Sequence, residues 1–371
     1  MEVNRHERLK RRFTIFALLQ AFLICLTIFL SINYFGSTVW EQRTAIGLIL
    51  VDARNDSGWP REITQGLQSA CDGHHYNLYI EDKVPVDEAN LERITKKMLG
   101  KNVKKIFLIG DFSSQAIESI AKKHPNVTFF TNSIEDSYAD NIFKFSVRYH
   151  EARYLAGILA GLHTKSDIIG YIAPFPSLET YQDLNAFALG VQKVRPDIKV
   201  KVIWTEIWHS VNQENKALYL LQNAGADIIT YYGPSQHIAQ EAAALEVDYI
   251  DFHNIEDNSS PHCIAAIDPD WQTICDHLLD ININKSLSKY YWRGMMDDVI
   301  TLHLGPDISP KEKSAVLDSQ EKILAGYPIF SGEIIDQHGI TRCKTDTVID
   351  NNSLRKGMNW LVKGVDIIET R

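Results

Sequence analysis

Short β-rich runs alternate with amphipathic helical patterns over most of this chain. The first series is "AIGLILV" (residues 45–51), "YNLYI", "KIFLIG" and "VTFF", with segments such as "EANLERITKKML" and "SQAIESIAKKH" between the runs. A second series follows, "DIIGYIA", "KVKVIW", "DIITYY" and "VDYIDF", separated by segments such as "DLNAFALGVQKV" and "NQENKALYLLQNAG". Strands that alternate with helices form parallel sheets with helices on their faces. The sequence therefore predicts an α/β fold with two parallel-sheet units of similar size.

The amino terminus has the pattern of a membrane anchor. Five basic residues between Arg5 and Arg12 precede the apolar run "FTIFALLQAFLICLTIFLSINYFG", which begins at Phe13 and is long enough to span a bilayer as a helix. Cleavage as a signal peptide requires a small residue where the chain has Phe35, so an uncleaved anchor is favoured over a cleaved signal. We expect residues 1–12 in the cytoplasm, residues 13–35 in the inner or plasma membrane, and the rest outside, in the periplasm or extracellular space.

Charge and cysteine spacing exclude several classes of protein. The net charge of the chain is −9, and its acidic and basic residues are interspersed, so we do not expect nucleic acid as a partner. Outside the apolar run the cysteines are Cys71, Cys263, Cys275 and Cys343, with no CxxC pair and no histidine at metal-ligand spacing. Neither a metal nor another cofactor is expected. Three disulfide pairings of these cysteines, and free buried thiols, all stay open.

Aromatic and acidic residues follow many of the predicted strands. In open parallel sheets ligands bind at the carboxyl ends of the strands. The residues that follow strands here are Asp56, Trp59, Phe175, Glu179, Trp208, Tyr231, Tyr232 and His253. Flat rings with a few carboxylates suit a planar ligand that forms hydrogen bonds, such as a nucleobase. The alternative for each aromatic residue is ordinary packing in a core or between lobes.

Motifs of known enzymes are missing. The sequence has no GxSxG, P-loop, HExxH or strand-associated GxGxxG pattern, and its histidines fall in no recognisable motif. We therefore expect a protein without catalytic activity. The remaining enzymatic alternative is a nucleoside or glycoside hydrolase, which needs two acids in one cleft; Asp56 with Glu179 is the candidate pair.

Several stretches together resemble one family. They are, in order, "NDSGWPREITQG", "RYHEARYLAGILAGLHTKSDIIGYIAPFP", "LNAFALG", "GADIIT", "FSGEIIDQHG" and "GMNWLVKGV". From Ala45 to its end the chain resembles the basic membrane protein family of ABC-transporter substrate-binding proteins, in particular the branch that binds purines and purine nucleosides. The resemblance rests on the common order of these stretches rather than on any one of them.

The resemblance implies a type I periplasmic-binding-protein fold, with two doubly wound parallel-sheet lobes joined by a three-strand hinge. The implied crossings lie near Arg148, Ala266 and Lys289, which gives a first lobe of 43–148 plus 267–288 and a second of 149–266 plus 289–371. The segment "DPDWQTICDHLLDI" would return to the first lobe as a helix. In the closing segment, Met358, Asn359, Trp360 and Val365 would pack against the second lobe's sheet.

The resemblance also implies site residues. Trp59 matches the family's stacking loop and Asn185 lies on a matching helix, whereas the loops after Trp208, Tyr232 and His253 and the segment around Asp297 depart from the family pattern. Such departures should alter binding of the usual ligand. The predicted ligand-binding residues are Asp56, Trp59, Phe175, Glu179, Asn185, Trp208, Tyr231, Tyr232, His253 and Asp297.

Two binding functions follow as hypotheses. The first is a membrane-tethered solute-binding protein that clamps a small planar, purine-like ligand between its lobes and delivers it to an ABC transporter permease. The second is a receptor subunit that uses the same cleft to report ligand binding to a membrane sensor protein. Both take a small molecule as ligand and a membrane protein as partner.

Overall fold

The computed structural model describes residues 2–39, 43–55, 58–132, 139–233, 236–252, 260–281 and 289–369. The chain divides into two compact units, Met1–Thr44 and Ala45–Arg371. The first unit contains the helix α1 (Glu2–Val39). Its stretch Arg11–Ser31 has 21 residues and a mean hydropathy of 2.5, which suits a membrane-spanning helix, although signal sequences share these properties.

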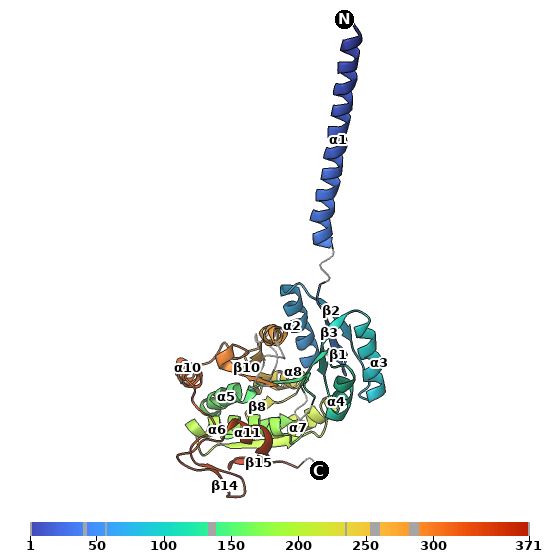
Figure 1. Cartoon of the computed structure of the whole chain (residues 1–371). Coiled ribbons are helices and arrows are strands. Elements are labelled where there is room, and N and C mark those ends of the chain that lie inside the picture. The colour runs from blue at the N-terminus through green and yellow to red at the C-terminus, as the bar shows by residue number, and fades with distance from the viewer. Residues whose placement is uncertain are drawn as a thin grey trace. The chain divides into compact units, whose positions relative to one another are not determined.

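The first lobe is built on a fully parallel sheet with the strand order β11-β5-β4-β3-β1-β2 (Figure 1). Its strands are β1 (Ala45–Leu50), β2 (Asn77–Glu81), β3 (Val103–Ile109), β4 (Thr128–Thr131), β5 (Ile142–Val147) and β11 (Tyr290–Arg293). The helices around it are α2 (Trp59–Gly73), α3 (Glu88–Leu99), α4 (Ser114–Lys123) and α9 (Trp271–Asp280).

The side chains of β1 point alternately to the two faces of this sheet, which explains why helices cover both faces. Leu48 points into a core shared with Ile63 and Leu67 of α2, whereas its neighbour Ile49 points into a separate core with Leu91 of α3 and Ile117 of α4. Successive side chains of a strand face opposite sides, so a run of apolar residues needs cover on each side. Figure 1 shows α2 on one side of β1 and β3, and α3 and α4 on the other.

The second lobe is built on a seven-stranded sheet with the order β12-β10-β9-β8-β6-β7-β15. Its strands are β6 (Ile168–Ala173), β7 (Lys199–Trp204), β8 (Ile228–Tyr231), β9 (Asp248–Phe252), β10 (Cys263–Pro269), β12 (Ile300–Leu304) and β15 (Val365–Ile367). Only β12 runs antiparallel to its neighbour. The remaining elements are α5 (Tyr149–His163), α6 (Leu178–Val194), α7 (Val211–Asn223), α8 (His237–Ala244), η1 (Met295–Asp297), α10 (Pro310–Leu324), α11 (Asn351–Gly357) and the hairpin β13 (Ile334–Ile335) with β14 (Thr341–Cys343).

Helices α5 and α6 approach each other unusually closely. A Cβ atom added to Gly157 would lie 2.0 Å from the carbonyl oxygen of Phe187, and one added to Gly190 would lie 2.1 Å from that of Tyr154. Only glycine allows this backbone-to-backbone contact. The crossing fixes the direction of α6, which carries part of the site described below.

The segment predicted to return as a helix of the first lobe does so. Helix α9 packs on α2: a Cβ atom at Gly66 would lie 2.5 Å from that of Trp271. The crossings differ in position from the expected ones near Ala266 and Lys289. Residues Ile267–Pro269 still pair with β12 in the second sheet, and β11 pairs with β5 in the first sheet. The chain therefore crosses between the lobes after Pro269 and after Arg293. These positions are set by which strands pair with each other, and the sequence pattern does not show that pairing.

The closing segment packs on the second lobe largely as expected. Met358, Trp360 and Val365 are buried, and β15 pairs with β7. The expectation for Asn359 was wrong, because its side chain is exposed. The segment is instead held by Asn185, whose Nδ2 donates to the Trp360 carbonyl (2.8 Å) and whose Oδ1 accepts from the Val362 amide (2.9 Å).

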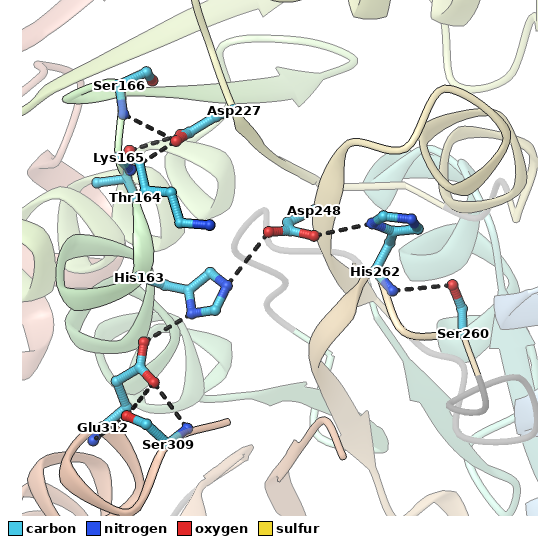
Figure 2. Close-up of polar contacts among 10 residues, drawn as sticks. All are labelled: His163, Thr164, Lys165, Ser166, Asp227, Asp248, Ser260, His262, Ser309 and Glu312. Carbon is cyan, nitrogen blue, oxygen red and sulfur yellow. Dashed lines mark hydrogen bonds and ion pairs between the residues drawn. The ribbon is translucent and has the colours of Figure 1, made fainter. Parts of the chain in front are cut away.

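A polar network joins the amino ends of the second lobe's central strands (Figure 2). His163, at the end of α5, lies between Glu312 of α10 (2.7 Å) and Asp248 at the start of β9 (3.3 Å). Asp248 also contacts His262 just before β10 (3.1 Å). Beside it, Asp227 accepts hydrogen bonds from residues 164–166. The network fastens the end of the sheet that is opposite to the carboxyl ends of its strands.

Candidate functional site

A cavity of about 40 Å³ lies between the two lobes. We call it the interlobe cavity. One wall comes from β5 and β11 of the first sheet, and the other from α5, α6 and α11 of the second lobe. Its lining residues are Lys144, Ser146, Val147, Tyr149, His150, Leu178, Glu179, Gln182, Asp183, Tyr290, Trp292, Arg355 and Lys356.

Two carboxyl groups of α6 line this cavity. Ser177 caps the helix in a capping box with Thr180, so that Glu179 falls in the first turn and Asp183 one turn later on the same face. Glu179 is half-buried and accepts a hydrogen bond from Ser146 Oγ of the first lobe (3.4 Å). Asp183 is only 4% exposed, and its Oδ2 has no hydrogen-bond partner among the described residues.

Burial disfavours the charged form of both acids. Desolvation raises the pKa of Glu179 to about 7, against the opposing effect of the hydrogen bond from Ser146. Desolvation raises the pKa of Asp183 to about 8; Arg153 opposes this shift and the charge of Glu179 adds to it. The acid pair therefore holds at least one proton near neutral pH, which is unusual for carboxyl groups and typical of binding and catalytic sites.

Aromatic rings gather beside the acid pair. The Phe252 ring, at the carboxyl end of β9, lies 5.4 Å from the ring of Tyr149 and 5.1 Å from that of Tyr232. Burial raises the pKa of both tyrosines well above the usual value, and the charges of Glu179 and Asp183 contribute to this rise. Both hydroxyl groups therefore stay protonated and can donate hydrogen bonds.

A buried arginine lies behind these rings. Arg153 of α5 is fully buried, with its guanidinium 4.4 Å from the Phe252 ring centre. Its Nη1 donates to Thr230 Oγ1 (2.9 Å) and its Nη2 to the Tyr231 carbonyl (2.6 Å). Its Nε and the hydroxyl of Tyr171 are buried without a hydrogen-bond partner among the described residues. Buried polar groups without a partner are rare in folded proteins, so this region has hydrogen-bonding groups that a ligand could use.

Cation–aromatic contacts join the lobes at the cavity's edge. The Arg355 guanidinium of α11 lies 4.6 Å from the ring centre of Tyr290, and that of Arg148 lies 4.7 Å from the Trp292 ring. His150 is buried next to Trp292, and burial lowers its pKa to about 3, so it is uncharged. These contacts hold β11 of the first lobe against the second lobe.

Five of the ten predicted site residues lie in three different places. Glu179 and Tyr232 lie together at the interlobe cavity and its aromatic neighbours. Phe175 and Trp208 contact each other (ring centres 5.7 Å apart) beyond β6 and β7, and Trp208 is exposed. Trp59 is half-buried against Trp271, with their ring centres 6.0 Å apart.

The remaining predicted residues make internal contacts or lie outside the described chain. Asn185 binds the closing segment, and the fully buried Tyr231 donates its hydroxyl hydrogen to Asp251. Asp297 accepts from the Gly294 amide (3.2 Å) at the start of η1. Asp56 and His253 fall outside the described residues.

The prediction missed several residues of this region. These are Tyr149, Arg153, Asp183, Phe252, Tyr290, Trp292 and Arg355. A signal existed for Asp183, because it follows Glu179 by four residues in a helical pattern and therefore shares its face. No sequence signal distinguishes Tyr290 and Trp292 from ordinary strand residues, since their role depends on β11 pairing with β5.

A second cavity, of about 450 Å³, lies where β10 passes into α9. Its walls include the acidic residues Glu62, Asp268, Asp270 and Asp298. Among the described residues, no group of three or more His, Cys, Asp or Glu side chains is arranged to hold a metal ion. All five cysteines are free thiols, and four of them are buried.

Comparisons with known proteins fit this architecture. Residues 43–329 match the family described as ABC transporter substrate-binding protein PnrA-like. A purine-binding protein of Brucella abortus is 28% identical over 352 residues, which is 89% of this chain and 95% of that protein. A putative ABC transporter glucose-binding protein of Haloferax volcanii is 26% identical over 280 residues, 74% of this chain and 71% of its own length. The crystal structure of an ABC transporter solute-binding protein of Aeropyrum pernix has a TM-score of 0.64 at 14% identity and covers 85% of this chain and 98% of that one. The chain thus belongs to the Bmp family of PnrA-like ABC transporter substrate-binding proteins.

Proposed function

We propose that this protein is a membrane-tethered, extracytoplasmic solute-binding protein that closes its two lobes on a small planar, purine-like ligand and delivers it to an ABC permease. The observation that carries the proposal is the acid pair Glu179 and Asp183 beside the rings of Tyr149, Tyr232 and Phe252. A flat ring with N–H groups at its edge would stack on the aromatic surfaces and donate to the carboxyl oxygens.

One relative supports a purine-like ligand, whereas another is named for a sugar. The Brucella relative is named as a purine-binding protein, and the Haloferax relative as a putative glucose-binding protein. Sugars also stack on aromatic rings and bind carboxylates. The tight contacts among Tyr149, Phe252 and Tyr232 form an aromatic surface that favours a planar ring. Trp59, which is half-buried next to Trp271, stays our candidate for a stacking contact from the first lobe.

Ligand entry requires the lobes to separate. The interlobe cavity of about 40 Å³ holds a few water molecules at most, whereas pockets for small organic ligands are typically about 300–1,000 Å³. The cation–aromatic contacts of Arg148 and Arg355 join the lobes and would have to loosen or shift when the hinge opens. Hinge opening and closure around ligand is the expected motion of this architecture.

Helix α1 supports the membrane tether of this proposal. The basic residues that precede its apolar stretch would keep the amino terminus in the cytoplasm and leave Ala45–Arg371 outside. A tethered solute-binding protein stays close to the permease that it serves. Because the family is described as substrate-binding proteins, we assign the acid pair to ligand binding rather than to catalysis.

The test is binding by the full chain purified in detergent micelles. Native mass spectrometry would identify copurifying small molecules, and calorimetry would measure binding of adenine, adenosine and glucose. We expect adenine or adenosine to bind and to remain chemically unchanged. Binding of glucose with neither purine compound would refute the ligand class, and release of free base from adenosine would refute the non-catalytic assignment.

A further inference from the structure

Asp183 has a buried carboxyl oxygen that accepts no hydrogen bond from the described residues. Its side chain lines the interlobe cavity and is 96% shielded from solvent, since 4% of it is exposed. Its Oδ2 has no hydrogen-bond partner among the described residues. A buried carboxyl oxygen without a hydrogen-bond partner is costly, and because this one lies in the wall of the interlobe cavity, a ligand in the cavity could supply the missing partner.

The neighbouring cation does not satisfy this oxygen. Arg153 directs Nη1 and Nη2 to Thr230 and to the Tyr231 carbonyl, both on β8. The Tyr171 hydroxyl also has no hydrogen-bond partner among the described residues. Arg153 therefore places a positive charge near Asp183, while both of its Nη atoms donate to β8.

This inference rests on the proposed function, in which the ligand is purine-like. We propose that Asp183 determines specificity by accepting a hydrogen bond from an amino group on the ring edge of the ligand. A carboxylate only accepts hydrogen bonds, so it favours an N–H donor and leaves a methyl group in the same position without a partner. The ligand class is therefore an amino-substituted nitrogen heterocycle, rather than any planar ring of similar size.

The proposal includes a dependence on pH. An N–H donor binds the ionised carboxylate more strongly than the protonated acid, so ligand binding favours release to solvent of the proton that burial keeps on Asp183 in the free protein. Glu179 on α6 titrates in a similar range. Tyr149, Tyr171 and Tyr232 have raised pKa values and stay neutral. The basic groups that face this region are Arg153 and, at the cavity wall, Lys144 and Arg355. His150 stays neutral because burial lowers its pKa.

Adenine and 6-methylpurine are suitable probes, because they have similar size and differ by an amino group in place of a methyl group. Binding of each to the full chain in detergent micelles would be measured by calorimetry at about pH 6 and about pH 8. We expect the unmodified protein to prefer adenine by roughly tenfold at the higher pH, with a smaller preference at the lower pH. Asp183→Leu should remove the preference.

Asp183→Asn is the control that separates the acceptor from the charge. The amide oxygen of asparagine still accepts a hydrogen bond but does not titrate. This variant should therefore keep a preference for adenine while losing most of its pH dependence. If Asp183→Leu does not fold, the pH profile of Asp183→Asn decides the question by itself.

The outcomes distinguish this inference from the proposed function. Equal affinity of the unmodified protein for adenine and 6-methylpurine would overturn the role of Asp183 and leave purine binding intact. An unchanged adenine preference in a folded Asp183→Leu protein would do the same. Absence of binding by both compounds would overturn the proposed ligand class and this inference with it.

Discussion

Replacing Asn185 with alanine should destabilise the second lobe and leave its ligand affinity nearly unchanged. Asn185 is fully buried, and its side chain satisfies the Trp360 carbonyl at 2.8 Å and the Val362 amide at 2.9 Å. The variant leaves both backbone groups buried without these partners. Each such group costs about 1–3 kcal/mol, so we expect the free energy of unfolding to fall by roughly 2–6 kcal/mol.

The neighbouring residue Asn359 provides a matched control for this variant. Its side chain is exposed, so Asn359→Ala should change the free energy of unfolding by less than about 0.5 kcal/mol. Urea unfolding of the full chain in detergent, followed by tryptophan fluorescence, would measure both variants, and calorimetry with adenine would measure affinity. A fully stable Asn185→Ala protein that no longer binds ligand would refute the reasoning and assign Asn185 to the ligand site.

Three further predictions test the fold, the acid pair and the topology. Gly157→Ala should lower the free energy of unfolding by about 1–3 kcal/mol or more, because the new Cβ atom would lie 2.0 Å from the Phe187 carbonyl oxygen. Gly73→Ala is the control and should be tolerated, because no atom lies within 4 Å of the position of its Cβ atom. Equal melting temperatures of the two variants would contradict this prediction. The raised pKa values of Glu179 (about 7) and Asp183 (about 8) mean that the stability associated with their protonated forms is complete below about pH 4 and is lost as pH rises through 7 and 8. The urea midpoint of the ligand-free protein should therefore fall from pH 6 to pH 9, and should fall less in Asp183→Asn; a flat profile would argue against buried, protonated acids. Finally, a reporter fused after Arg371 should be active only outside the cytoplasm in a protein that keeps its amino-terminal segment; recovery of a shortened soluble chain would disprove the anchor.

Sequence periodicity was sufficient to predict many of the strands and helices of the fold, although strands such as β5 and β12 were not predicted. The pattern "EANLERITKKML" coincides with α3 (Glu88–Leu99), and the run "KVKVIW" coincides with β7 (Lys199–Trp204). These predictions succeed because a helix with one buried face and a strand with both faces buried impose patterns that are local in the chain. The order of the stretches that resemble the family then indicated the family, and its match over residues 43–329 confirms it.

The orientation of the site residues depended on tertiary structure. Tyr231 and Tyr232 are adjacent in sequence, yet Tyr231 points into the second lobe toward Asp251 while Tyr232 contacts Phe252 beside the acid pair. Neighbouring residues at a strand end face opposite sides, and the sequence does not say which side meets the cleft. Asp183 could be placed on the face of Glu179 by its spacing, but its burial comes from the packing of α6 on α5 and on the rest of the lobe. Whether a carboxyl group keeps its proton is decided by the atoms that surround it, and those atoms come from segments far apart in the chain.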